Sequence, residues 1–337
     1  MKFLIITQKA DRTDPILGFF HRWIEEFTAQ TEQVIVIAQQ TGVFNFPKNV
    51  TVLSLGKEAG KSKLGQILRF WILIWKHRKS YDRVLVHMTP IWVVLGWKIW
   101  FLLRKPVYLW YEIRRGSLKL SFALFVVRKV FSASKEGLPQ PSRKQVVTGH
   151  GIDTDFFSPS EKTRDPHRII AIGRITRSKR YDVILRTFAA LPSHFKLEIA
   201  GGTITASDIT ELQNLQTLIQ ELHITNRVSI RWVSPAQMPE FLQSASLLLH
   251  ACIGGLDKVL LEAMACGVPV VSCSEAAKEE LPELCAATPE TMIAKAQSLL
   301  MMSEEKREKL GKELRQNVIE KHGLVRLIGR MVEEMES

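Results

Sequence analysis

The sequence alternates short, largely apolar segments with longer segments that favour helices, and this alternation limits the folds that the chain can adopt. In the first half, five segments have the length and β-branched content of buried strands, at residues 3–7, 33–38, 50–55, 83–87 and 107–111. Four stretches of helical periodicity accompany them, at residues 18–30, 64–79, 91–103 and 118–130. A βαβα order of this kind predicts a parallel sheet with helices on both faces.

A second series of predicted strands follows at residues 168–172, 196–200, 228–232, 246–250 and 268–272. Between the two series, residues 147–159 contain two glycines and a proline and break the pattern. We therefore predict an α/β protein with two doubly wound, Rossmann-like domains, over residues 1–155 and 156–315. Residues 316–337 are predicted to form a C-terminal helix that packs back toward the N-terminal domain. A chain of 337 residues is long enough to bury two cores.

The positive charge is concentrated in the first half of the chain. Residues 1–155 hold 24 lysines and arginines and 11 aspartates and glutamates, so their net charge is 24 − 11 = +13. The net charge of the whole chain is +12, so the rest of the chain adds no net positive charge. Seven of the eight tryptophans also lie there. Trp71 and Trp75 are one helical turn apart and precede the basic run 76–79, a combination that suits an anionic membrane interface. The alternative is a core helix with a solvated basic end.

Several other classes of protein are disfavoured. The apolar stretch 91–103 contains Lys98 and is too short to span a membrane. The sequence opens without a signal-peptide pattern, and its four cysteines show neither zinc nor disulfide spacing, so we expect a cytoplasmic protein. No G-x-G-x-x-G follows the first strand, which disfavours a nicotinamide dehydrogenase. The basic charge is not accompanied by a nucleic-acid-binding signature, so no nucleic acid partner is expected.

Residues 254–272 combine a glycine turn, a helix and a strand. Gly254 and Gly255 allow a backbone to approach a ligand closely, because glycine has no Cβ. The helix expected at 258–266 would direct its free N–H groups and positive dipole end toward that turn. Glu262 lies one turn into the helix, where its carboxylate can reach a ligand hydroxyl. The arrangement suits a phosphate-bearing ligand, although an ordinary βα unit with a surface glutamate remains the alternative.

The first strand of the second series ends in a glycine followed by two spaced cations. Gly173 precedes Arg174 and Lys179, which have R-x4-K spacing. Ligands of open α/β sheets bind at the carboxyl ends of strands, and this pair of cations would suit a diphosphate. A solvent-exposed basic loop is the alternative. Gly201 and Gly202 end the next strand and are a second place for close approach to a ligand.

Together these motifs resemble the retaining glycosyltransferases of family four, or glycosyl transferases group 1, which have the two-domain GT-B fold. The resemblance covers nearly the whole chain: GIDTDFF is similar to the family's N-G-V-D-x-x-x-F, AIGRITRSKRYD to its G-R-x-x-x-x-K-G, and GGLDKVLLEAMACGVPVV to its E-x7-E segment and the residues after it. It implies two domains that face each other across a cleft. It also implies that the second domain binds a nucleotide sugar, most simply a UDP- or GDP-sugar, as the substrate.

By position, the resemblance assigns the diphosphate to Arg174 and Lys179 and the ribose hydroxyls to Glu262. The donor-binding residues that we predict are Gly173, Arg174, Lys179, Gly201, Gly202, Trp232, Val233, Gly254, Gly255, Leu256, Asp257, Lys258, Val259 and Glu262. We predict Gly18 and His87 on the acceptor side.

Two family residues are missing. The first glutamate of E-x7-E falls on Gly254, so Asp257 is the only carboxylate nearby. The family's histidine after the fifth strand falls on Glu112 or Ile113 within residues 110–115. We predict that Glu112 lies nearest the anomeric carbon, and that Glu112, Arg174, Lys179 and Glu262 form the catalytic set.

The resemblance implies a retaining, hexosyltransferase-type enzyme without a cofactor. Because Arg174 and Lys179 already supply positive charge, we expect no metal at Asp153 and Asp155, which resemble a DxD motif only in their spacing. The expected acceptor is a glycan or a lipid-linked molecule of cell-surface polysaccharide biosynthesis. The enzyme is then expected to lie peripherally on the inner face of the cytoplasmic membrane. A catalytically impaired sugar-nucleotide-binding protein of the same fold is the alternative.

Overall fold

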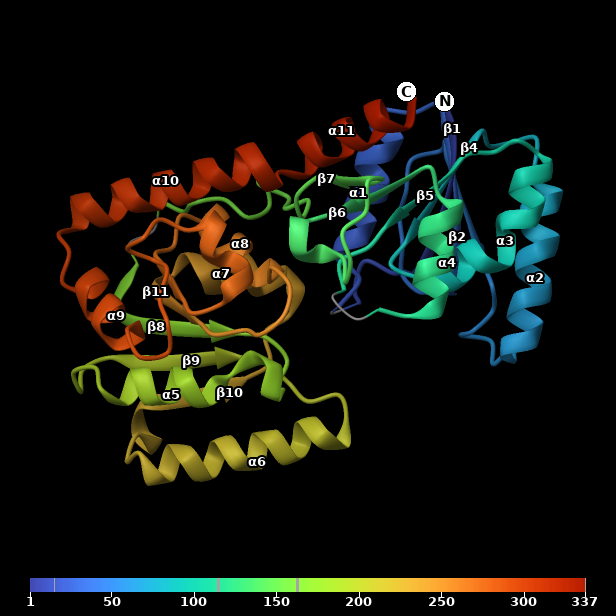
Figure 1. Cartoon of the computed structure of the whole chain (residues 1–337). Helices are drawn as coiled ribbons and strands as arrows, with labels where there is room; N and C mark the ends of the chain where they lie inside the picture. Colours follow the sequence, from blue (N-terminus) through green and yellow to red (C-terminus); the bar gives the residue numbers. More distant parts are fainter. Residues whose placement is uncertain (15, 114–115, 162–163, 337) are drawn as a thin grey trace. The chain divides into compact units, whose positions relative to one another are not determined.

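The computed structural model describes residues 1–14, 16–113, 116–161 and 164–336 (Figure 1). The chain forms two compact units. The first consists of Met1–Gly151 together with Gly323–Ser337, and the second of Ile152–His322. The chain therefore enters the second unit at Ile152 and returns to the first at Gly323, between its last two helices.

The first unit contains a seven-stranded parallel sheet. Its strands are β1 (Lys2–Ala10), β2 (Gln33–Thr41), β3 (Val50–Ser54), β4 (Arg83–His87), β5 (Val107–Trp110), β6 (Lys129–Ser132) and β7 (Gln145–Val147). They are ordered β3-β2-β1-β4-β5-β6-β7, and every neighbouring pair is parallel. The strand order reverses direction between β1 and β4, as in a Rossmann sheet. The helices are α1 (Phe19–Ala29), α2 (Lys63–Lys76), α3 (Pro90–Leu102), α4 (Leu118–Val126) and α11 (Leu324–Glu336).

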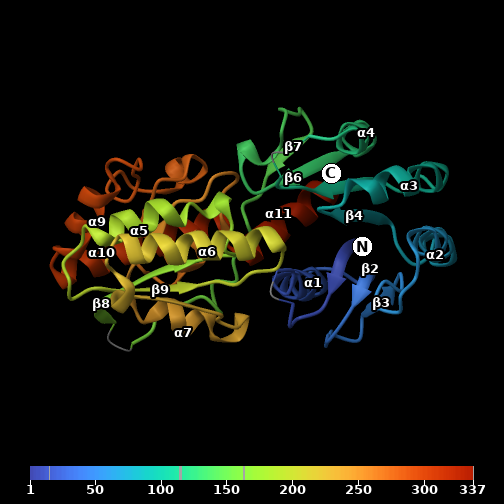
Figure 2. The same cartoon turned by 90° about the horizontal axis from the view of Figure 1, so that it is seen from below.

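Each face of this sheet carries its own core, because successive side chains of a strand point to opposite faces. In β1, Phe3 and Ile5 pack with residues of α1 and α11. Leu4 and Ile6 pack on the other face with residues of α2, α3 and α4. Figure 2 shows α2, α3 and α4 in a row along one side of the sheet. Both faces are therefore covered, as the alternation of strands and helices predicted.

Two strands of the first unit were not predicted, and one predicted helix is too long. The helix expected at 118–130 ends at Val126, because Val127 adopts an extended conformation with φ −67° and ψ 149°. Residues Lys129–Ser132 then pair with β5 as β6. The segment is only four residues long and follows the helix almost directly, so helical periodicity masked its β-branched and aromatic residues.

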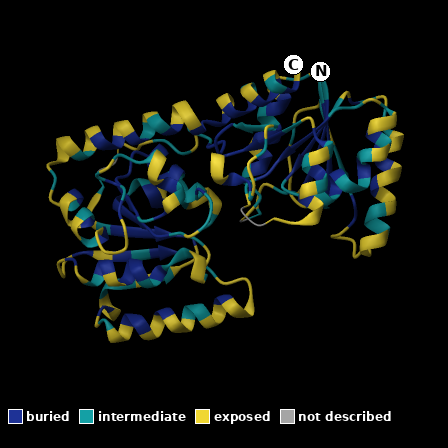
Figure 3. Ribbon diagram, viewed as in Figure 1, coloured by how far each residue is buried: buried dark blue, intermediate teal, exposed yellow. Residues whose placement is uncertain are grey.

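The second unit contains a five-stranded parallel sheet of the same type. Its strands are β8 (Asp165–Ile172), β9 (Lys196–Ala200), β10 (Val228–Arg231), β11 (Ala245–His250) and β12 (Val270–Ser272), in the order β10-β9-β8-β11-β12. Its helices are α5 (Tyr181–Ala189), α6 (Ala206–Glu221), α7 (Met238–Gln243), α8 (Lys258–Ala265), α9 (Met292–Leu300) and α10 (Glu304–His322). Strands β11 and β12 are buried throughout (Figure 3), whereas the edge strand β10 contains no buried residue. The strand order reverses between β8 and β11.

The described helices are all too short or too polar to cross a lipid bilayer. The uniformly apolar α3 has 13 residues, whereas a span of the hydrocarbon layer needs about 20.

Helix α11 belongs to the first unit through one apolar stripe. Leu327, Ile328, Met331 and Met335 are fully buried, while Val325 on the same helix is 63% exposed. Helix α11 packs against α1 and, through the carbonyl oxygen of Met335, accepts a hydrogen bond from the hydroxyl of Tyr108 at 3.1 Å. The helix thus completes the core on one face of the first sheet.

We expect Leu327→Ala to destabilise the first unit by about 2–5 kcal/mol, because it leaves a cavity in a fully buried contact. Val325→Ala is the matched control and should change the stability by less than about 0.5 kcal/mol. Denaturant unfolding followed by tryptophan fluorescence reports mainly on the first unit, which holds seven of the eight tryptophans. Equal effects of the two substitutions would contradict this account of α11.

Candidate active site

The reversal of strand order in the second sheet brings two loops together at the carboxyl ends of β8 and β11. The loop after β8 covers residues 173–180, and the loop after β11 covers residues 251–257. The backbone N–H of Ile253 donates to the carbonyl oxygen of Ser178 at 2.7 Å and joins the two loops. Open α/β sheets bind ligands at such a point, because neighbouring loops leave in opposite directions there.

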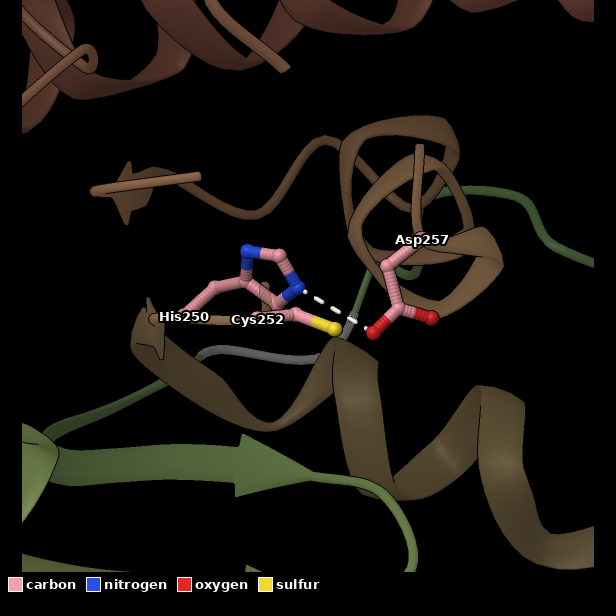
Figure 4. Close-up of side chains that lie close together, drawn as sticks. All are labelled: His250, Cys252 and Asp257. Carbon is pink, nitrogen blue, oxygen red and sulfur yellow. Dashed lines mark hydrogen bonds and ion pairs between the residues drawn. The ribbon is translucent and has the colours of Figure 1, made fainter. Parts of the chain in front are cut away.

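A buried carboxylate links these loops. Asp257 lies directly before α8, forms an ion pair with the ammonium of Lys179 from the first loop, and accepts a hydrogen bond from His250 Nε2 at 3.2 Å (Figure 4). The other ring nitrogen of His250 lies 2.8 Å from the hydroxyl of Ser272. Only 16% of the Lys179 side chain and 13% of the Asp257 side chain are exposed. The ends of β8, β11 and β12 and the start of α8 therefore meet at one carboxylate.

The ion pair fixes the protonation states of both partners. Burial alone would raise the pKa of Asp257, but the Lys179 ammonium and the His250 ring hold that pKa well below its usual value. Burial would likewise lower the pKa of Lys179, and the Asp257 carboxylate raises it instead. Both groups are therefore charged at neutral pH. An ammonium has three N–H donors, so Lys179 keeps the capacity to bind a second anion.

Gly173 makes this position of Lys179 possible. Its φ is +139°, and a Cβ built on it would lie 2.6 Å from Cε of Lys179. A larger residue would be strained and would also displace the lysine. The hydroxyl of Tyr181 donates a hydrogen bond to the carbonyl oxygen of Gly173 at 2.7 Å and stabilises the same turn. The glycine in the sequence motif thus makes room for the lysine six residues later.

Glu262 and Lys258 are a second pair of neighbouring ionisable groups, both on α8. They are four residues apart, so their side chains lie on one face of the helix. Both residues are partly buried, and the loss of hydration raises the pKa of Glu262 and lowers that of Lys258. Lys258 opposes the rise for Glu262, while the Asp257 carboxylate adds to it. A ligand that donates hydrogen bonds to Glu262 would favour its charged form.

Arg174 occupies the rim of the site. Its side chain is 48% exposed, and its Nε lies 3.7 Å from a carboxylate oxygen of Asp208. Asp208 is buried and forms a capping box with Thr205 at the start of α6. The structure therefore brings Lys179, Asp257, Lys258 and Glu262 into one electrostatic cluster, while Arg174 pairs with a different element.

The remaining predicted donor residues divide into open and packed positions. Gly254 has φ +132°, and a Cβ on it would meet nothing within 4 Å. Trp232 is 60% exposed and lies against Gly202, whose Cβ would be 3.3 Å from its ring. Gly201, by contrast, is close to the backbone of Gly173, because its Cβ would lie 2.3 Å from that carbonyl oxygen.

The side chains of Val233 and Leu256 are buried in the core, whereas Val259 and Gly255 are partly exposed. Val233 and Leu256 thus have a packing role, and their donor role stays a prediction.

Among the described residues, one group of three side chains has the spacing of metal ligands. Atoms of His250, Cys252 and Asp257 lie within 4.8 Å of one another (Figure 4). The group fits a metal poorly, since Lys179 already supplies a cation to Asp257. Burial also raises the pKa of the Cys252 thiol to about 12, whereas metals bind the thiolate. Asp153, from the DxD-like segment, accepts hydrogen bonds from the backbone of Asp155 and Phe156 at 3.2 and 3.1 Å.

In the first unit, the carboxylate of Glu112 holds a turn. One of its oxygens accepts hydrogen bonds from the backbone N–H groups of Ala133 at 2.7 Å and Ser134 at 3.4 Å. The other oxygen accepts from the Ser134 hydroxyl at 3.0 Å. Both oxygens thus anchor the segment between β6 and the short 3-10 turn η1 (Lys135–Gly137). This arrangement is typical of a structural carboxylate, and the catalytic role of Glu112 stays a prediction. Ile113 is exposed, and residues 114–115 lie outside the described residues.

His87 lies at the end of β4, at the point where the strand order of the first sheet reverses. Its ring stacks on Phe20 with a centroid distance of 3.9 Å, and its Nδ1 is 3.4 Å from the Thr7 hydroxyl. The side chain is 1% exposed. Gly18 precedes α1, and a Cβ there would lie 2.5 Å from the carbonyl oxygen of Asp14. Both residues thus have a packing role, and their acceptor role stays a prediction.

Sequence analysis missed His250 as a site residue. It was predicted only as the last residue of a strand, although it ends β11 beside the reversal of strand order. A polar residue at the carboxyl end of a strand, directly after three leucines, could have indicated it.

We expect Asp257→Ala to destabilise the second unit by about 3–5 kcal/mol at pH 7, because it leaves the Lys179 ammonium buried without its counter-ion. Asp155→Ala, at an exposed carboxylate of the same unit, is the control. Since the pKa of Asp257 lies below its usual 3.8, its contribution is complete above that pH and decreases on further acidification. Hydrogen exchange of the β11 amides, compared between the wild type and Asp257→Ala at several pH values, would measure the stability of the second unit. A stability difference that grows below about pH 4 would contradict this pH dependence.

Most of the second unit is similar to one known family of proteins. Residues 153–317 match the family model of the glycosyl transferases group 1. The D-inositol 3-phosphate glycosyltransferase of Mycobacterium sp. (strain KMS) is 33% identical over 148 residues, which are 40% of this chain and 32% of that protein. The protein of the same name from Mycolicibacterium smegmatis (strain ATCC 700084 / mc(2)155) is 29% identical over 163 residues, 45% of this chain and 37% of its own. The matches thus span about a third of the length of these curated relatives.

Solved structures resemble the whole chain at low sequence identity. Anabaena Alr3699/HepE in complex with UDP has a TM-score of 0.78 and 15% identity, with 100% of both chains covered. Sucrose-phosphate synthase (tll1590) from Thermosynechococcus elongatus has a TM-score of 0.77 and 16% identity, with 98% of both chains covered. These likenesses confirm the predicted GT-B fold class. Residues 153–317, which contain Lys179, Asp257 and Glu262, are thus similar to the glycosyl transferases group 1.

Proposed function

We propose that the protein is a glycosyltransferase that moves a sugar from a nucleoside diphosphate sugar to a glycan or a lipid-linked acceptor. The observation that carries this proposal is the meeting of Lys179, Asp257 and Glu262 at the strand reversal of the second sheet. The same residues lie within the part of the chain that matches the glycosyl transferases group 1. Several similar structures are described as complexes with UDP, UDP and glucose, or UDP-glucose, which supports a nucleotide sugar as the donor.

The chemistry of the site supports a diphosphate ligand. The first turn of α8 has backbone N–H groups without partners inside the helix, and these carry a partial positive charge. Asp257 is the residue before this turn, but its side chain makes no capping bond and pairs with Lys179 instead. Lys179 and the start of α8 can therefore both bind phosphate oxygens, and Arg174 can add charge from the rim.

In this proposal the positive groups stabilise the diphosphate as it departs from the sugar. When the bond between the anomeric carbon and the diphosphate breaks, negative charge develops on the diphosphate oxygen that leaves. Fixed cations near that oxygen lower the energy of the transition state. Glu262 would hold the ribose hydroxyls and thereby align the donor. We further propose retention of the anomeric configuration, hexose transfer and no requirement for a metal, because Lys179 and Arg174 supply the charge that a divalent ion would otherwise supply.

An acceptor attached to a lipid would place the enzyme at a membrane surface. We include in the proposal a peripheral position on the inner face of a cytoplasmic membrane and a role in cell-surface polysaccharide synthesis. The excess of positive charge in residues 1–155 supports this position.

Glu262→Gln is expected to weaken binding of the nucleotide sugar by about tenfold or more, because the amide removes a charged acceptor for the ribose hydroxyls. Glu313→Gln, an exposed change on α10, is the matched control. Thermal shift with UDP-, GDP- and ADP-sugars measures binding, since a ligand selective for the folded protein stabilises it in proportion to the logarithm of its concentration. If none of these ligands shifts the wild-type protein, the donor proposal is wrong.

Transfer activity should persist in EDTA and should decrease by about a hundredfold in Lys179→Met, which removes a charge from the leaving diphosphate. Donor turnover against a panel of glycan and lipid-linked acceptors is the measurement, and proton NMR of the product gives its anomeric configuration. Activity that is lost in EDTA and restored by manganese would contradict the metal-free mechanism.

The second candidate function is a sugar-nucleotide-binding protein without catalysis. The replacement of the family's first glutamate by Gly254 favours it, as does the structural engagement of Glu112. Donor binding without hydrolysis or transfer on any acceptor of the panel would establish this function.

A further inference from the structure

Helix α2 is apolar on two sides. Its inner side, which includes Phe70 and Ile74, is fully buried against the first sheet. A second apolar stripe faces the solvent and consists of Leu64, Leu68, Trp71, Ile72 and Trp75, with exposed fractions between 37% and 65%. The spacing of three to four residues places these side chains on one face of the helix. The outer stripe does not contribute to the packing of α2 on the sheet, so packing does not explain its apolar side chains.

The neighbouring helices extend this apolar surface. Phe101 and Leu102, at the end of α3, are both 76% exposed. Leu118 and Phe125, seven residues apart on α4, are 91% and 81% exposed. Helices α3 and α4 pack against each other, and α3 also contacts α2. Figures 1 and 2 both show the three helices side by side, and Figure 3 shows exposed residues along them. We call the solvent side of these helices the α2–α4 face.

The charged residues around this face are all positive. Segments 61–79, 90–105 and 116–128 hold eleven lysines and arginines and no aspartate or glutamate. Lys63 and Lys76 lie at the two ends of the apolar stripe of α2, and both are exposed. The guanidinium of Arg78 lies 4.7 Å from the centre of the Trp75 ring. Tryptophan beside a cation is typical of the boundary between lipid headgroups and acyl chains.

We propose that the α2–α4 face binds the surface of an anionic lipid bilayer. The apolar side chains would enter the boundary between headgroups and acyl chains, and the surrounding lysines and arginines would bind lipid phosphates. The short helices fit a position parallel to the surface, because none of the described helices can cross the bilayer. A second copy of the chain fits less well, since a symmetric contact would oppose like charges.

This inference names the surface that the proposed membrane position requires, and its test does not involve the donor site. Sedimentation with vesicles of phosphatidylcholine alone, or with phosphatidylglycerol added, measures binding of the full chain without any nucleotide. We expect binding to the phosphatidylglycerol vesicles to be at least about tenfold tighter and to weaken at high salt. A protein that binds neither vesicle at low salt would overturn the inference, even if glycosyl transfer is confirmed.

Two variants of the face separate its apolar part from its charge. Ile72→Glu combined with Phe101→Glu should reduce vesicle binding by about tenfold or more, because charged side chains would have to enter the interface. Lys76→Glu combined with Lys79→Glu should remove most of the preference for phosphatidylglycerol. The matched control is Val325→Glu on α11, which is 63% exposed and belongs to a helix on the opposite face of the same sheet.

Unchanged binding by both double variants would overturn the proposal. Analytical ultracentrifugation tests whether a second copy of the chain binds the α2–α4 face instead. A wild-type dimer that dissociates in Ile72→Glu with Phe101→Glu, together with no vesicle binding, would assign the face to a second copy of the chain and overturn the lipid proposal.

Discussion

The second unit depends on one buried carboxylate. Asp257 receives the ammonium of Lys179 from the loop after β8 and a ring nitrogen of His250 from the end of β11, and it lies at the start of α8. Without these partners its burial would be too costly, because a charge needs compensation when it leaves water. The same requirement fixes the conformation of Gly173, which must leave space for the lysine. The loop after β8 and the segment from the end of β11 to the start of α8 are thereby held together at the carboxyl edge of the sheet.

This ion pair also changes the view of the proposed donor site. The sequence motif assigned the diphosphate to Arg174 and Lys179 together, and the structure shows that the surroundings of these two cations differ. Lys179 is mostly buried and already neutralised, whereas Arg174 is half exposed and pairs with Asp208. A diphosphate would therefore share Lys179 with Asp257 and would draw Arg174 from the rim. The carboxylate that the family places eight residues before Glu262 is absent, and Asp257 is committed to the lysine.

The first unit combines a tightly packed interior with an unusual exterior. Its aromatic residues include His87, stacked on Phe20 inside the core, and also Trp75, exposed on α2. The two environments cannot be separated by composition, because both contain tryptophan and phenylalanine. Their difference lies in the helix face on which each side chain falls. The exposed residues follow one side of α2 and continue onto α3 and α4, which is why they form a surface and not a set of isolated contacts.

Much of the fold was determined by the sequence alone, because strand and helix periodicity are local properties. The alternation predicted both sheets, and the motifs at Arg174, Lys179 and Glu262 indicated the proposed donor site. The short strand β6 was missed, since its four residues directly follow a helix. Only the tertiary structure revealed that His250 supports Asp257 and that Glu112 anchors the turn at Ser134. Glu112 and Ser134 are 22 residues apart, and His250 meets Asp257 only through the fold of the loop between them. A charged or polar residue gives no local indication in the sequence of the partner that it will have in the fold.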